Sequence, residues 1–184
     1  MHLLLPLLQR TASRHSTRPT LSITSSGVHF WTKIPERLTA APNSLFSALA
    51  DPSLSNMQER YPVSKLLEVF YVRAFVEKHP TESFPVTINF VDPGLCWSNL
   101  GGEKGGWMLH MMRLALARST EYGSRTITHA GLQGKETHGQ FMANCKVRDV
   151  AKFVTSEEGV ALQGQVYGEV NAKLEKIRTG VTKV

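Results

Sequence analysis

A long apolar helix followed closely by a buried strand is the feature that most constrains how this chain can fold. Apolar side chains recur at helical spacing through residues 63–75, and His79–Pro80 ends that helix. Residues 85–91 are rich in β-branched and aromatic side chains and form the best strand candidate in the sequence, which Asp92–Pro93–Gly94 terminates. Because this strand must pair with others, the sequence predicts a layered α/β fold.

Further strands and helices follow the same alternation along the chain. The other predicted elements are a helix over 1–12, a strand over 20–24, an irregular stretch over 35–55, a helix over 119–132 capped by Ser119, a short strand near 139–142 and a helix over 156–177. Strands separated by helices predict a parallel sheet. The length of 184 residues fits a single domain, which we expect to span residues 1–184.

Composition and charge exclude several classes of protein. The chain is 41% apolar and 20% charged, which favours a soluble globular domain over a disordered one. The two cysteines and the scattered histidines match no metal-site spacing, so no metal is expected. The net charge of +6 is spread evenly, with an excess of +3 in each of residues 1–60 and 61–184. The sequence contains no cluster of basic residues, so a nucleic-acid partner is not expected. No apolar run approaches the ~20 residues of a membrane-spanning helix.

The N-terminal segment is open to two interpretations. Residues 1–35 contain no acidic residue but include Arg10, Arg14 and Arg18, as is typical of a mitochondrial presequence. The alternative, which we favour, is an ordinary helix whose apolar face carries Leu4, Leu7, Leu8 and Thr11. With that interpretation the expected location is the cytoplasm.

Tyr61 and Lys65 form the first candidate for chemistry. Their spacing of four residues places the phenol and the ammonium on one face of the predicted helix. A nearby ammonium stabilises a phenolate, which would make Tyr61 a proton donor and acceptor near neutral pH. The alternative is an exposed Tyr/Lys pair on a solvated helix face.

Small polar residues also follow both of the predicted central strands. Ser25–Ser26 comes directly after the strand over 20–24, and Pro93–Gly94 ends the strand over 85–91. In open α/β sheets ligands bind outside the carboxyl ends of the strands. The sequence therefore predicts that these two turns and the Tyr61 helix meet at one edge of the sheet.

This order of residues resembles the short-chain dehydrogenase/reductase superfamily, and within it the retinol-dehydrogenase-like branch common in fungi. The motifs that carry the resemblance are Arg60–Tyr61–Pro62–Val63–Ser64–Lys65–Leu66, the leading Leu3–Leu4–Leu5–Pro6–Leu7–Leu8 and Ser156–Glu157–Glu158–Gly159. The resemblance covers nearly the whole chain. It implies the C-terminal part of a doubly wound, Rossmann-type parallel sheet.

The resemblance also implies a role for each matched residue. Ser26 would orient the substrate oxygen, and Tyr61 would pass the proton and also contact the cofactor. Lys65 would stabilise the phenolate and hold the nicotinamide ribose. Pro93–Gly94 would lie against the nicotinamide, and Ser98 would contact its carboxamide. Ser26 is preferred to Ser25 because the second serine of such a pair is usually the catalytic one.

The implied activity is NAD(P)-dependent interconversion of an alcohol and a carbonyl on a small lipophilic molecule, in secondary metabolism, with NADP favoured over NAD. The sequence lacks the family's Gly-rich turn after an opening strand, and Gly101–Gly106 lies too late to replace it. We therefore expect the catalytic half of an N-terminally truncated enzyme. A catalytically inactive fragment or an interaction protein derived from the family is the alternative. Homo-oligomerisation stays open.

The apolar stretch from Trp107 to Arg118 has three interpretations. It can form a lid over a lipophilic substrate, a helix resting on a membrane surface, or part of the core. The lid is favoured, because its several methionines would adapt to the shape of a substrate.

Overall fold

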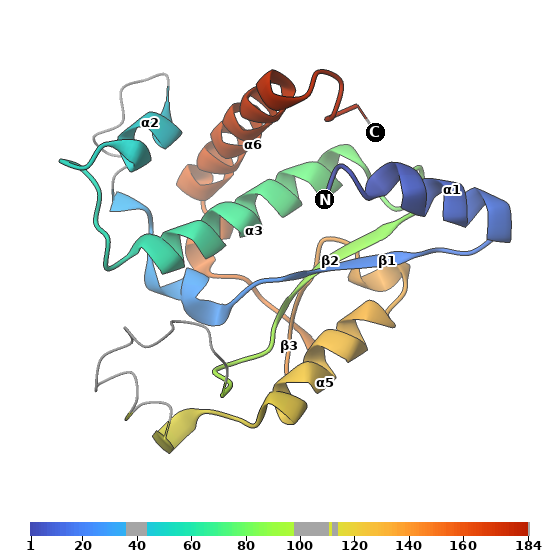
Figure 1. Ribbon diagram of the computed structural model, residues 1–184, viewed down its shortest axis with the longest axis horizontal. Coiled ribbons are helices and arrows are strands. Elements are labelled where there is room, and N and C mark those ends of the chain that lie inside the picture. The colour runs from blue at the N-terminus through green and yellow to red at the C-terminus, as the bar shows by residue number, and fades with distance from the viewer. Residues whose placement is uncertain (36–43, 98–110, 112–113, 184) are drawn as a thin grey trace.

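Three parallel strands and one antiparallel edge strand form the central sheet of the computed structural model (Figure 1), which describes residues 1–35, 44–97, 111 and 114–183. The strands lie in the order β1 (Thr20–Thr24), β2 (Thr87–Asp92), β3 (Phe141–Ala143) and β4 (Lys146–Arg148). β1, β2 and β3 are parallel, and β4 is antiparallel to β3. The predicted α/β fold with a parallel sheet is confirmed.

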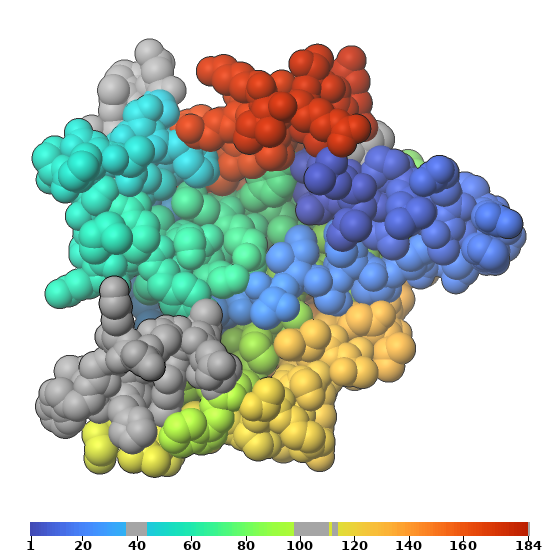
Figure 2. Space-filling model, in the orientation of Figure 1, coloured from blue at the N-terminus to red at the C-terminus, as the bar shows by residue number. Residues whose placement is uncertain are grey.

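Helices cover both faces of this sheet (Figure 1). On one face lie α1 (Leu5–His15) and α3 (Arg60–Lys78), and α6 (Glu157–Ile177) packs along α3. Figure 2 shows α6, in red, above α3. The opposite face is covered by α5 (Thr120–Gly131), whereas α2 (Leu45–Ala50) packs against α6. Three short 3-10 helices complete the described elements: η1 (Gly27–Trp31), η4 (Lys135–Thr137) and η5 (Lys152–Thr155).

The side chains of β2 show why both faces must be covered. Ile88 and Phe90 are fully buried in the larger core under α3 and α6, whereas Val91 is buried in a small cluster with Ala130 of α5. Asn89, also fully buried, donates from Nδ2 to the carbonyl oxygen of Ala130 at 2.9 Å. A strand buried on both faces is typical of parallel sheets flanked by helices.

Local capping explains where the helices begin and end. The predicted N-cap Ser119 accepts a hydrogen bond from the backbone N–H of Tyr122 at 3.1 Å, and Ser156 accepts one from Gly159 at 3.1 Å. At the end of α3 the N–H of His79 bonds to the carbonyl of Val76, and Pro80 follows. The predicted positions of α3, α5 and α6 are confirmed.

The buried face of α1 differs from the predicted one. Leu5 and Ala12 are buried and Leu8 packs on the core, whereas Leu4 and Leu7 are 50% and 53% exposed. Only one narrow stripe of α1 meets the sheet layer, so the helix buries less of its leucine surface than the periodicity suggested. In the described residues no helix is long and apolar enough to cross a lipid bilayer.

Besides the three 3-10 helices, one α-helix and one strand were not predicted from the sequence. α2 lies inside the stretch that was expected to be irregular, and Ser44 caps it by accepting from the N–H of Ser47. β4 follows a two-residue turn in which Asn144 and Cys145 both have positive φ, 54° and 56°. Such turns join hairpin strands and are usually signalled by glycine, which this turn lacks.

Candidate functional site

The turns that follow β1 and β2 meet at the carboxyl edge of the sheet. The backbone N–H of Ser25 donates to the carbonyl oxygen of Val91 at 2.7 Å. A Cβ atom at Gly27 would lie 3.0 Å from the Oδ2 atom of Asp92, so the two turns touch through a glycine that has no side chain. The structure thus brings the serine pair and the Pro–Gly turn together.

The two adjacent serines have different surroundings. Ser26 is half-buried and caps η1, because its Oγ atom accepts a hydrogen bond from the N–H of Val28 at 3.4 Å. Ser25 is only 3% exposed, and its Oγ atom has no hydrogen-bond partner among the described residues. A hydroxyl must reach the surface to meet a substrate, so the geometry favours Ser26 over Ser25.

The side chain of Lys65 links the second turn of α3 to the end of β1 by a hydrogen bond. Its ammonium donates to the carbonyl oxygen of Thr24 at 2.8 Å and to the Oε2 atom of Glu68 at 3.1 Å. Thr24 directly precedes the serine pair, so the ammonium lies at the predicted site. An ammonium carries three N–H donors, and these two contacts leave one of them available.

Tyr61 lies one helical turn before Lys65 at the start of α3. Its side chain is 42% exposed, and its hydroxyl makes no hydrogen bond to any residue in the described part of the chain. The described contacts of Lys65 go to Thr24 and Glu68 and not to this hydroxyl. The phenol is therefore open to a ligand, and the predicted influence of Lys65 on it stays a prediction.

Glu68 is a neighbour of the site that sequence reasoning missed. One of its oxygens pairs with Lys65, and the other, Oε1, is buried without a hydrogen-bond partner among the described residues. The only signal in the sequence was its position three residues after Lys65 on a helix. That order, with the base before the acid, is the weaker one on isolated helices.

The Pro–Gly turn has a backbone shape that requires glycine. Gly94 has φ +77°, and its N–H donates to Oδ1 of Asp92 at 2.9 Å. A Cβ atom there would lie 3.2 Å from the guanidinium of Arg118, a second neighbour that the sequence did not reveal. The backbone N–H of Arg118 also donates to the carbonyl oxygen of Leu95 at 2.8 Å. Arg118, two residues before α5, therefore stabilises the Pro–Gly turn.

Several predicted residues lie outside the described part of the chain. These are Ser98, the Gly101–Gly106 stretch and most of the predicted lid, including Trp107. Of the lid's described residues, Met111, Leu114 and Leu116 are more than half exposed. The three interpretations of this stretch therefore stay open.

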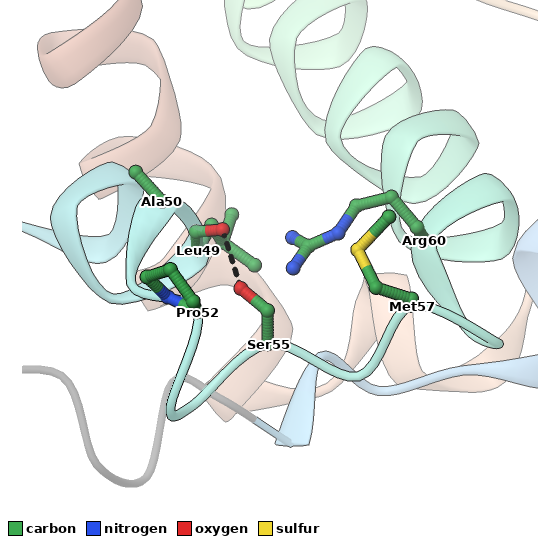
Figure 3. A pocket seen from close by; sticks show the side chains of 6 residues that line it. All are labelled: Leu49, Ala50, Pro52, Ser55, Met57 and Arg60. Atoms are coloured by element: carbon green, nitrogen blue, oxygen red, sulfur yellow. Dashed lines mark hydrogen bonds between the residues drawn. The ribbon is translucent and has the colours of Figure 1, made fainter.

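A cavity of about 360 Å³ opens beside the start of α3 (Figure 3). The residues that line it are mostly apolar: Leu49, Ala50, Pro52, Ser55, Met57 and Arg60. In Figure 3 the guanidinium of Arg60 points into the space between α2 and α3, across from Ser55, whose hydroxyl donates to the carbonyl of Leu49 at 3.0 Å. Arg60 and Tyr61 both belong to the first turn of α3, so this apolar hollow opens at the same end of that helix as the candidate site.

The buried ring of His29 stabilises the serine turn through a hydrogen bond to its backbone. The ring is fully buried, and its Nδ1 lies 2.8 Å from the carbonyl oxygen of Ser26, which can only accept. Its Nε2 lies 3.3 Å from the backbone N–H of Ala151, which can only donate. The ring is therefore neutral with the proton on Nδ1. Burial lowers the pKa of His29, while the bond to Ser26 and the charge of Asp92 act in the opposite direction.

Acid is expected to destabilise the protein through this histidine. The unfolded chain binds a proton at His29 near the ordinary pKa of 6.5, whereas the folded ring stays neutral to lower pH. The free energy of unfolding is therefore fully maintained above pH 6.5 and falls as the pH drops from there toward the folded pKa. Denaturant unfolding at several pH values should show a shallower loss for His29→Gln than for the wild type. The exposed control His15→Gln should keep the wild-type slope, and an unchanged slope in His29→Gln would contradict this assignment.

Comparisons with known proteins give the family. The short chain dehydrogenase/reductase dmxR8 of Cryptosporiopsis sp. (strain 8999) is 43% identical over 182 residues, which are 98% of this chain and 56% of the relative. The short-chain dehydrogenase anuD of Penicillium roqueforti is 33% identical over 97% of this chain and 49% of its own length. The short chain dehydrogenase atnD of Emericella nidulans is 38% identical over 68% of this chain and 40% of its own length.

The chain spans about half the length of the curated relatives that it matches most fully. No family model matches the sequence, and no solved structure matches it. The similarity to dmxR8 nevertheless runs through the serine turn, the Tyr61 helix and the Pro–Gly turn, because it covers nearly all of this chain. On this similarity, together with the parallel α/β sheet, the chain belongs to the short-chain dehydrogenase/reductase family.

Proposed function

We propose that this chain carries the catalytic residues of an NAD(P)-dependent oxidoreductase that interconverts an alcohol and a carbonyl on a small lipophilic molecule. One observation carries the proposal: the ammonium of Lys65 is bonded to the end of β1 beside Ser26, on the helix that also bears Tyr61. The names of the fungal relatives, all of them short-chain dehydrogenases, support the same reaction type.

The chain's own residues would handle the proton. In the reductive direction the Tyr61 hydroxyl donates a proton to the substrate oxygen, while the Ser26 hydroxyl donates a hydrogen bond that orients that oxygen. In the oxidative direction Tyr61 takes the proton back. Lys65 lies one turn along α3 and would stabilise the phenolate that forms. A bound nicotinamide supplies or accepts the hydride at the substrate carbon.

The residues present fit the reactive end of such a cofactor. Lys65 keeps one N–H donor for a ribose hydroxyl, and the Gly94 turn lies at the same edge of the sheet, with the Arg118 guanidinium beside it. Pro93 and Ser98 would complete this contact with the nicotinamide. NADP is proposed over NAD, and the residues that would hold its far end are not assigned.

The lipophilic character proposed for the substrate rests on the cavity at the start of α3. Apolar side chains from α2 and the following segment form its walls, and the exposed Met111, Leu114 and Leu116 add further apolar surface to the protein. A substrate of this kind would suit secondary metabolism in the cytoplasm, where we place the protein's activity. Its partner is then a small alcohol or carbonyl compound.

The direct test is consumption of NADPH or NADH with a panel of lipophilic ketones and aldehydes, and the reverse assay with the matching alcohols. The expected result is turnover that needs both nucleotide and substrate. A folded sample that consumes neither nucleotide with any compound of the panel would contradict the proposed activity.

A further inference from the structure

A second cavity, of about 630 Å³, lies on the α3 side of the sheet where β3 and β4 form its edge. It shares no residue with the cavity at the start of α3. Its lining includes the aromatic residues Phe30 and Phe141 and the basic residues Arg73, Arg148 and Lys152. Its volume lies within the range of about 300–1,000 Å³ that is usual for small-molecule sites.

The cations of this cavity come from three separate elements, α3, β4 and η5. None of the three makes an ion pair with any described residue. Among the described residues, Arg73 donates from Nε to the neutral Oε1 of Gln163 at 3.3 Å. Asp149 is the one acidic residue of the lining. Three cations against one carboxylate give the cavity a net charge of +2.

A flat apolar surface lies beside these charges. The Phe30 ring is 50% exposed, and the buried His29 ring supports it at a centroid distance of 4.3 Å. His29 in turn meets Phe141 edge-on at 4.9 Å. The exposed part of the Phe30 ring can therefore pack against a planar group of a ligand without a large rearrangement.

We propose that this cavity binds the phosphate monoester of a small aromatic molecule. Two guanidinium groups and one ammonium supply many N–H donors. Each guanidinium can donate two parallel hydrogen bonds to two oxygens of one phosphate. A phosphate monoester carries about −1.5 to −2 charges at pH 7, which matches the net charge of the lining. The phosphate binds Arg73, Arg148 and Lys152, and the ring packs on Phe30.

The buried side chain of His29 connects this cavity to the serine turn. Ala151, between the cavity residues Val150 and Lys152, donates its N–H to Nε2 of His29. The same ring donates from Nδ1 to the carbonyl oxygen of Ser26. A ligand that shifts residues 150–152 therefore shifts the backbone at Ser26. This link is a property of the fold and does not depend on the proposed oxidoreductase activity.

The test is an amide NMR titration of the 184-residue chain with phenyl phosphate, inorganic phosphate and benzyl alcohol, without nucleotide. Phenyl phosphate should bind saturably and shift the amides of residues 139–141, 148–152 and 26–30. Inorganic phosphate and benzyl alcohol, which each lack one half of the recognised group, should bind at least about tenfold more weakly.

Variants locate the site. Arg148→Met and Lys152→Met both change exposed residues, and each should weaken phenyl phosphate binding by about tenfold or more. Arg125→Met is the matched control, because Arg125 is exposed on α5 and pairs with Glu121 on the opposite face of the sheet. Equal shifts with benzyl alcohol, equal weakening in Arg125→Met, or no saturable binding would overturn the site. Shifts at residues 148–152 without shifts at 26–30 would overturn the link to Ser26.

Discussion

Replacing Tyr61 with Phe should lower turnover by about 10²–10⁴-fold, the usual contribution of a positioned proton donor. The substitution removes only the hydroxyl, which makes no hydrogen bond in the described part of the chain, so the fold should be unaffected. Nucleotide binding should change little, because Lys65 and Gly94 stay in place. The measurement is nucleotide-dependent turnover, with the unfolding temperature recorded for each sample.

Tyr167→Phe is the matched control for that experiment. Tyr167 lies on α6, where its ring stacks on Tyr71 and lies 5.5 Å from the ammonium of Lys78, away from the serine turn. Removing its hydroxyl should leave turnover unchanged. Near-normal turnover in Tyr61→Phe would show that the proton comes from another group and would remove Tyr61 from the mechanism.

Among the glycines that the structure describes, Gly159 is the one whose replacement by Ala should lower the stability of the protein most. A Cβ atom at Gly159 would lie 1.9 Å from the carbonyl oxygen of Phe153 and 2.9 Å from that of Val154. Both obstacles are backbone atoms of η5, so the first turn of α6 would have to move away from it. We expect the free energy of unfolding to fall by about 3 kcal/mol, at the upper end of overpacking effects.

Gly164→Ala, one and a half turns further along α6, should have the opposite sign. No atom lies within 4 Å of a Cβ at that position, and the residue is exposed. Alanine is favoured over glycine in helix interiors by about 0.5–1 kcal/mol, so this variant should be slightly more stable than the wild type. Denaturant unfolding of both variants checks the pair. A Gly159→Ala protein as stable as Gly164→Ala would show that α6 does not pack on η5 in this way.

The sequence was a good guide wherever the determinants of structure are local. Ser119 and Ser156 cap α5 and α6 because a side-chain oxygen satisfies a backbone N–H three residues later. The predicted strand over residues 20–24 is β1, because a short run rich in β-branched residues favours a strand. The role of Gly159 could not be foreseen, although it belongs to a motif that carries the family resemblance.

Contacts between distant segments could not be predicted from local pattern. Arg118 reaches Gly94 across 24 positions of sequence, and His29 reaches Ala151 across 122. Neither pair leaves a periodic or motif signal. The same is true of Glu68, because its pairing with Lys65 becomes notable only once both are known to lie at the end of β1. The candidate site was found through the family resemblance and the order of elements, and its neighbours through the fold.

Binding of NADPH and NADH to the purified chain, followed by nucleotide fluorescence, tests the central claim most directly. We expect saturable binding, and we expect Lys65→Met to weaken it by at least about tenfold, since one charged hydrogen-bond donor is lost. Lys78→Met, at the far end of α3, should bind like the wild type. A folded sample that binds neither nucleotide, or a Lys65→Met protein that binds as tightly as the wild type, would contradict the claim that this edge of the sheet holds a nicotinamide cofactor.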